Sequence, residues 1–77
     1  MIDDIYVNHP PHYQGRDGME AIDVIAAFTY DLTGMEAVCT ANAIKYILRW
    51  KSKGGVQDVD KAIWYLEYLR NSLKGEN

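Results

Sequence analysis

One row of polar side chains in the middle of the chain has the types and spacing to bind an anion. Between residues 42 and 53 an amide, a phenol and three cations recur at steps of three and four residues, the spacing of one α-helical face. They are Asn42, Lys45, Tyr46, Arg49 and Lys53, and the row contains no acidic residue. Because Arg forks onto two oxygens and Lys supplies a point charge, the row predicts a phosphate-bearing ligand.

The same row has two other interpretations, and the residue types leave all three open. Its cations could lie on a solvated face and pair with later carboxylates, of which Asp58, Asp60 and Glu67 are the candidates. The row could also bind an acidic protein partner.

The first 17 residues hold further candidate ligand contacts. Pro10 and Pro11 force an extended or turning backbone, so we interpret residues 1–17 as an ordered arm. His9 and His12 lie three apart on this loop, but no Cys or carboxylate follows at a matching spacing, so we predict no metal site. We predict ligand contacts by the side chains of His9, His12 and Tyr13, the alternative being that these side chains pack structurally and cap backbone groups.

Catalytic motifs are missing from the pattern. No phosphate-binding G-x-x-x-x-G-K-[ST] loop occurs, and nothing places Cys39 beside a histidine as a nucleophile pair. We therefore name no catalytic residue and expect no cofactor.

The elements that must position these side chains are helices. Apolar periodicity and start signals predict helices over residues 18–29, 34–52 and 57–73, which gives an all-α fold. Asp17 with Glu20 and Thr33 with Glu36 have the spacing of capping boxes. Gly54-Gly55 is expected to end the long helix and to join the last two helices as an antiparallel hairpin.

The last predicted helix has two different sides. Val59, Ala62, Leu66, Leu69 and Leu73 form an aliphatic stripe. Lys61, Trp64, Tyr65 and Tyr68 form an aromatic and basic side. A helix with two such sides usually contacts two things, here the preceding helix and either a partner subunit or a ligand. We add Lys61, Trp64 and Tyr65 to the candidate ligand contacts, and we expect residues 74–77 to fray.

Length and composition limit the class of protein. A chain of 77 residues forms one domain, here residues 1–77, and its six Tyr and two Trp suit an interface, so we expect a homo-oligomer. A formal net charge of −3 argues against general nucleic-acid binding, and no apolar run is long enough for a membrane span. The lone Cys39 fits a reducing compartment, so we expect a cytoplasmic protein.

Several segments, taken in order, resemble the small SaV-like family, which is encoded mainly by bacteriophages and prophages. The resemblance covers about residues 7–69. It is carried by Val7-Asn8-His9-Pro10-Pro11-His12-Tyr13, Glu20-Ala21-Ile22-Asp23-Val24-Ile25, Asn42-Ala43-Ile44-Lys45-Tyr46-Ile47-Leu48-Arg49, Lys53-Gly54-Gly55, Asp58 and Lys61-Ala62-Ile63-Trp64-Tyr65-Leu66.

The family pattern also occurs within a phage nucleotide kinase that lacks a P-loop, so the resemblance implies a nucleotide-like ligand. By position, the resemblance implies ligand contacts by Asn8, His9, His12, Tyr13, Asn42, Lys45, Tyr46, Arg49, Lys53, Lys61 and Tyr65. Members often carry glycine where this chain has Ala41, and the family is usually less bulky at Trp50-Lys51-Ser52. Because the kinase is also much larger, its activity does not carry over with the shared segment.

Residues and resemblance together favour a small phage-type protein that binds a nucleotide or nucleotide-derived phosphate without turning it over. It could sequester a host signalling nucleotide, an anti-defence role in the cytoplasm of the infected or lysogenic bacterium. The first alternative is a deoxynucleoside monophosphate kinase, which would need Mg²⁺ held by carboxylates such as Asp23 or Asp58. The second is a module whose aromatic side docks on a host protein.

Overall fold

Three α-helices follow one another in the computed structural model, which describes residues 15–75. A short 3₁₀ turn, η2 (Arg16–Gly18), precedes α2 (Ala21–Thr29), α3 (Gly34–Arg49) and α4 (Gly55–Leu73). The all-α class and the three helices are therefore confirmed. Most of the predicted arm, residues 1–14, lies outside the described part of the chain, as do residues 76–77.

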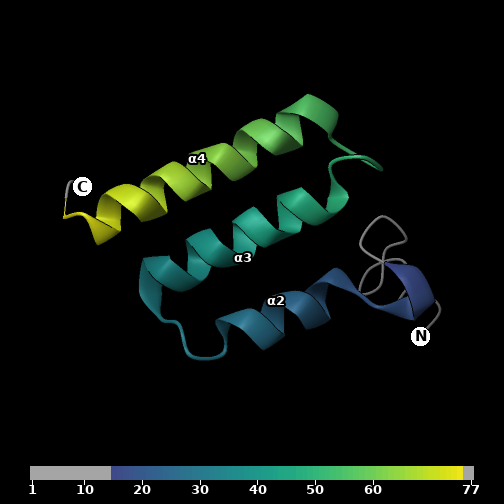
Figure 1. Cartoon of the computed structure of the whole chain (residues 1–77), viewed down its shortest axis with the longest axis horizontal. Coiled ribbons are helices and arrows are strands. Elements are labelled where there is room, and N and C mark those ends of the chain that lie inside the picture. Colours follow the sequence, from purple (N-terminus) through teal and green to yellow (C-terminus); the bar gives the residue numbers. More distant parts are fainter. Residues whose placement is uncertain (1–14, 76–77) are drawn as a thin grey trace, which may run out of the picture.

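Helix α3 is the central element and contacts both other helices. The more extensive contact is with α4, which runs back alongside α3 as an antiparallel hairpin (Figure 1). Helix α2 packs on the other side of α3. The hairpin predicted from the glycine pair is confirmed, and it places residues of α3 beside residues of α4.

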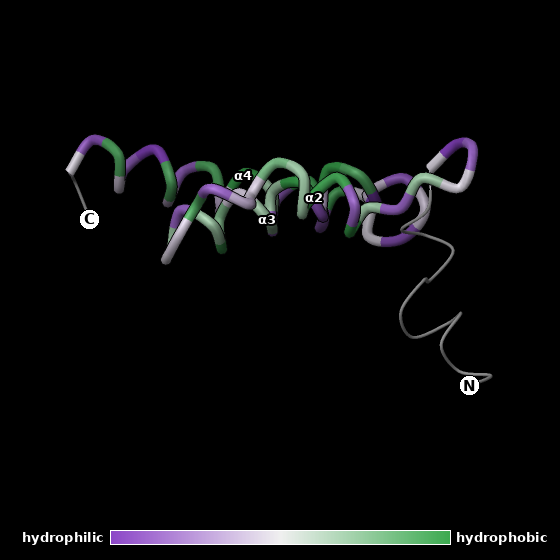
Figure 2. The backbone as a smooth tube through the Cα atoms, turned by 90° about the horizontal axis from the view of Figure 1, so that it is seen from below, coloured by the Kyte–Doolittle hydropathy of each residue, from purple (hydrophilic) through white to green (hydrophobic). Residues whose placement is uncertain are grey.

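The three helices form a single layer, which Figure 2 shows from its edge. The fully buried apolar side chains of residues 15–75 are all small, namely Ala21, Cys39, Ala43 and Ala62. Small side chains let helix backbones approach closely, but they remove little apolar area from water. Many larger apolar side chains, including Ile47, Ile63 and Leu66, stay about half exposed on the layer.

The start of α2 differs from the sequence prediction. The helix begins at Ala21, three residues later than expected, and Glu20 rather than Asp17 is its N-cap residue. Asp17 lies inside η2 with a φ of 61°, so the backbone turns there instead of entering the helix. Thr33 is the N-cap of α3 as predicted, but neither N-cap side chain makes a capping hydrogen bond. Both predicted capping boxes are wrong.

The connection between α3 and α4 is longer than predicted. Helix α3 ends at Arg49, and its carbonyl oxygen accepts hydrogen bonds from the backbone N–H groups of Ser52 and Lys53, each at 3.1 Å. Gly54 is the N-cap of α4, and Gly55 opens α4 with a φ of 53°, a conformation that favours glycine. The glycine pair thus starts α4 instead of ending α3, and Lys53 lies in the turn outside the helical row.

Candidate functional site

The ring of Tyr46 is the point on the hairpin where cations from two helices meet. From α3, the Lys45 Nζ atom lies 4.5 Å and the Arg49 Cζ atom 4.8 Å from the ring centroid. From α4, the Lys61 Nζ atom lies 5.3 Å from the same centroid. All three distances are within the range of a cation–π interaction, so the π system of one ring attracts three positive groups.

A row of aromatic rings continues from Tyr46 along α4. Tyr46 stacks on Tyr65, with centroids 6.1 Å apart and planes 18° from parallel. Trp64 meets Tyr65 edge-on at 5.0 Å and stacks on Tyr68 at 5.7 Å. Offset and edge-on pairs at these separations are attractive, so the row forms an ordered aromatic surface beside the cations.

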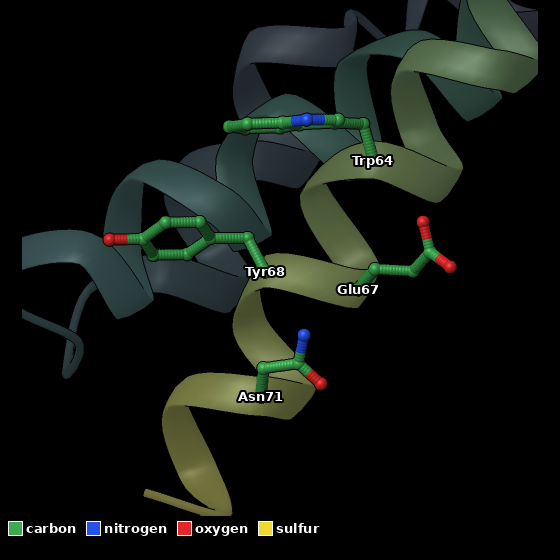
Figure 3. A pocket seen from close by; sticks show the side chains of 4 residues that line it. All are labelled: Trp64, Glu67, Tyr68 and Asn71. Carbon is green, nitrogen blue, oxygen red and sulfur yellow. The ribbon is translucent and has the colours of Figure 1, made fainter. Parts of the chain in front are cut away.

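An open groove of about 300 Å³ lies along α4 at the far end of this row. It is lined by Trp64, Glu67, Tyr68 and Asn71. Figure 3 shows the two aromatic rings extending to one side of the helix and the Glu67 carboxyl group extending to the other. The groove combines flat apolar surfaces with a carboxylate and an amide, which is the mixture that a flat, hydrogen-bonding heterocycle requires.

Arg49 also forms a buried ion pair between α3 and α4. Its Nε and Nη2 atoms donate to the Oδ2 and Oδ1 atoms of Asp58, each at 3.0 Å. The Gly54 N–H donates to Oδ2 at 3.0 Å as well, and the Asp58 residue is only 1% exposed. The pair is therefore bidentate and shielded, and it fixes the start of α4 against the end of α3.

These partners keep Asp58 ionised. The hydrogen bonds from Arg49 lower the pKa of the Asp58 carboxyl group below its ordinary value, although burial acts in the opposite direction. The charge of Arg49, the Gly54 N–H and the charge of Lys61 lower the same pKa further. The interpretation in which the row's cations pair with later carboxylates is thus confirmed for Arg49 and Asp58.

Gly54 is required by this arrangement. A Cβ atom at position 54 would lie 2.2 Å from both the Cγ and Oδ1 atoms of Asp58. No side chain fits at that distance, so the close approach of the Asp58 carboxylate explains why glycine precedes α4.

The structure brings six of the predicted site residues together. Around the Tyr46 ring and its aromatic row lie Lys45, Tyr46, Arg49, Lys61, Trp64 and Tyr65. Asn42 donates from its amide nitrogen to the Val38 carbonyl oxygen of its own helix at 2.9 Å. Lys53 is exposed in the turn. Asn8, His9, His12 and Tyr13 lie outside the described residues.

Three groove residues were not among the sequence candidates: Glu67, Tyr68 and Asn71. With Trp64 they occupy steps of three, four and seven residues, so they share one face of α4. That spacing was the available signal. Tyr68 belongs to the aromatic and basic side described above, whereas Glu67 and Asn71 are neither aromatic nor basic, so the residue types of that side did not indicate them.

Residues 15–75 contain neither a membrane-spanning helix nor a cluster of metal ligands. No helix in this range combines the length and the apolar character needed to cross a membrane. The same residues contain no group of three or more His, Cys, Asp or Glu side chains placed to hold a metal ion.

Comparison with known proteins places the chain in a family. Residues 7–67 match the model of a family described as "Protein of unknown function (DUF3310)". The chain is also 37% identical over 65 residues to the Gene 1.7 protein of Enterobacteria phage T3. That alignment covers 79% of this chain but 39% of the phage protein, so the chain spans well under half of its relative. No solved structure matches the chain. Since the family model spans α2, α3 and most of α4, this phage-type chain belongs to the DUF3310 family.

Proposed function

We propose that the protein binds a nucleotide or a nucleotide-derived phosphate ligand without turning it over. The observation that carries the proposal is the crowding of three cationic groups around the Tyr46 ring. Within residues 15–75, Arg49 has Asp58 as its carboxylate partner, whereas Lys45 and Lys61 form no ion pair. Two ammonium groups that lie near the same ring repel each other, so an anion bound by both would stabilise the site.

Each part of the site has a different role in this proposal. Lys45 and Lys61 hold the phosphate, and Arg49, engaged by Asp58, positions the Tyr46 ring between them. The base stacks on the aromatic row of Tyr65 and Trp64, where stacking contributes roughly 1–3 kcal/mol per base. The adjoining groove offers Glu67 and Asn71 to the edge of that base.

The SaV-like resemblance adds contacts that the geometry does not supply. It assigns ligand contacts to Asn8, His9, His12, Tyr13, Asn42 and Lys53. A small binding protein of phage type could sequester a host signalling nucleotide in the bacterial cytoplasm, which is the anti-defence role we propose.

Isothermal titration of the full chain with nucleoside mono-, di- and triphosphates tests the binding. Lys45→Gln and Lys61→Gln should each weaken binding roughly 10- to 100-fold, because a hydrogen bond to a charged group contributes about 1.5–3 kcal/mol. Binding should also weaken as salt is raised. Lys74→Gln, an equal charge change at the exposed C-cap of α4, is the control. Wild-type affinity in both site variants would refute the proposal.

The kinase alternative needs a metal and turnover. The carboxylate of Asp58, one of its two candidate magnesium ligands, is buried and already bonded by Arg49 and Gly54. The discriminating assay incubates the protein with ATP, each deoxynucleoside monophosphate and Mg²⁺, and analyses bound and free nucleotides. Retention without a new product supports sequestration, whereas conversion of a monophosphate to a diphosphate supports the enzyme.

The protein-binding alternative rests on the exposed aromatic side of α4, where Trp64 is 56% exposed. It predicts that Trp64→Ala abolishes capture of a host protein while Lys45→Gln leaves small-molecule affinity unchanged. The nucleotide proposal predicts loss of small-molecule affinity in both variants.

A further inference from the structure

Part of the aliphatic stripe on α4 stays exposed among residues 15–75, although Ala62 of the same stripe is buried. Val59, Leu66 and Leu73 recur at intervals of seven residues, and Ile63 lies beside them. Ile63 is 48%, Leu66 50% and Leu73 69% exposed, whereas Val59 is partly buried. The buried Asp58 and Ala62 face α3 instead, and α2 lies beyond α3 (Figure 1). An apolar repeat of seven on an exposed helix is the pattern that pairs with another helix.

Among residues 15–75, no second layer packs on this side. The described helices bury only small apolar side chains and form one layer, whereas stable domains are built from two packed layers around a core. A chain of this length buries only about 60% of the surface that its unfolded form exposes. A second copy of the chain could pack on this side, because other copies are present wherever the protein is made.

We propose that two copies pair through this stripe, with their α4 helices antiparallel across a two-fold axis near Leu66. Charge selects the orientation. In an antiparallel pair, the end of one α4 lies beside the first half of the partner's α4. Arg70 of one copy then lies near Asp60 of the other copy. Parallel pairing would set the two Arg70 side chains against each other, a repulsive arrangement.

The pairing is separate from the proposed ligand site. About 100° of helix turn per residue places Leu66 about 160° around α4 from Trp64, so the aromatic groove stays open in the dimer. The two proposals therefore fail independently, since loss of pairing and loss of nucleotide affinity are measured by different experiments.

Sedimentation of the full chain gives the first test. The wild type should sediment with twice the chain mass, and Leu66→Asp should sediment as a monomer, while Ser72→Asp, at an exposed position on another side of α4, keeps the dimer. Arg70→Glu should weaken the dimer and the added Asp60→Arg should restore it. A monomeric wild type at the highest attainable concentration would overturn the pairing, and an unrestored double variant would overturn the antiparallel orientation.

Cross-linking keeps the test valid if Leu66→Asp fails to fold. The native Cys39 is buried, so a cysteine added at the surface supplies the accessible thiol among residues 15–75. Under mild oxidation Leu66→Cys should form a disulfide-linked dimer quickly, because the two sulfur atoms meet near the axis. Gln57→Cys, exposed on another side of α4, should not. Equal rates in the two variants would contradict the proposed axis.

Discussion

Arg49 joins the two helices of the hairpin through contacts made in three directions. Its guanidinium group forms two hydrogen bonds with Asp58 and lies over the Tyr46 ring. Its backbone carbonyl oxygen accepts the hydrogen bonds from Ser52 and Lys53 in the turn that follows. Asp58 in turn receives the Gly54 N–H. At the scale of single residues, this pair holds Lys61 of α4 near Lys45 of α3 and so determines the geometry of the candidate site.

The glycine at position 54 should be irreplaceable because of the Asp58 carboxylate. Gly54→Ala should lower the free energy of unfolding by about 1–3 kcal/mol, the usual cost of overpacking. The measurement is a urea titration followed by circular dichroism. In an Asp58→Ala background the same change should cost clearly less, because the clashing group is gone. Equal costs in the two backgrounds would mean that the clash is not the cause.

The ionised Asp58 should also make stability depend on pH. Because folding lowers its pKa, its contribution is fully present above the unfolded-state pKa of about 4 and is lost as the pH falls through the lower folded-state pKa. The gap in melting temperature between the wild type and Asp58→Asn should therefore be constant at neutral pH and shrink below about pH 4. A gap that stays constant in acid would contradict the ionised pair.

The residue types of the site could be predicted from sequence, but their partners could not. The spacing of Lys45, Tyr46 and Arg49 put them on one helical face, and this placement is confirmed. The spacing left open whether each cation contacts a ligand or a carboxylate. Arg49 pairs with Asp58 because the hairpin turn brings position 58 back to position 49. Such a choice depends on the path of the turn, which local periodicity does not encode.

At the scale of elements, small side chains set how closely α3 and α4 pack. Ala43 and Ala62 are buried on the two helices, and close approach is what allows the rings of Tyr46 and Tyr65 to stack between them. The helices themselves were predictable because apolar periodicity is local. The ends of the helices were not predictable, because they depend on Asp58. Its carboxylate accepts the Gly54 N–H at the start of α4 and binds Arg49, the last residue of α3.

The packing of small side chains should resist enlargement. Ala62→Leu should lower the free energy of unfolding by about 1–3 kcal/mol, because a residue that is 1% exposed has no room for three more carbon atoms. Ala27→Leu, on an exposed position of α2, should change it by less than about 0.5 kcal/mol. Thermal unfolding of both variants measures the difference, and similar values for both would show that α3 and α4 do not pack closely at Ala62.

At the scale of the whole molecule, a single layer of helices has two broad faces and no core between layers (Figure 2). One side of α4 carries the aromatic groove and the cations near Tyr46, and the other carries the aliphatic stripe around Leu66. The first suits a charged, flat ligand and the second suits another copy of the chain. The division of α4 into two sides was predictable from its sequence. The absence of a covering layer over residues 15–75 was not, since it depends on where α2 packs.

If a second copy completes the fold, stability should depend on protein concentration. Unfolding of a dimer into two separate chains is opposed by mass action, so a hundredfold increase in concentration adds about 2.7 kcal/mol per dimer. For a chain of this size that corresponds to a rise in melting temperature of roughly 5–10 °C. Lys45→Gln should show the same rise, because its side chain lies away from the stripe, whereas Leu66→Asp should melt lower and at one temperature throughout. A wild-type melting temperature that does not change with concentration would show that the single layer of helices is stable without a second copy of the chain.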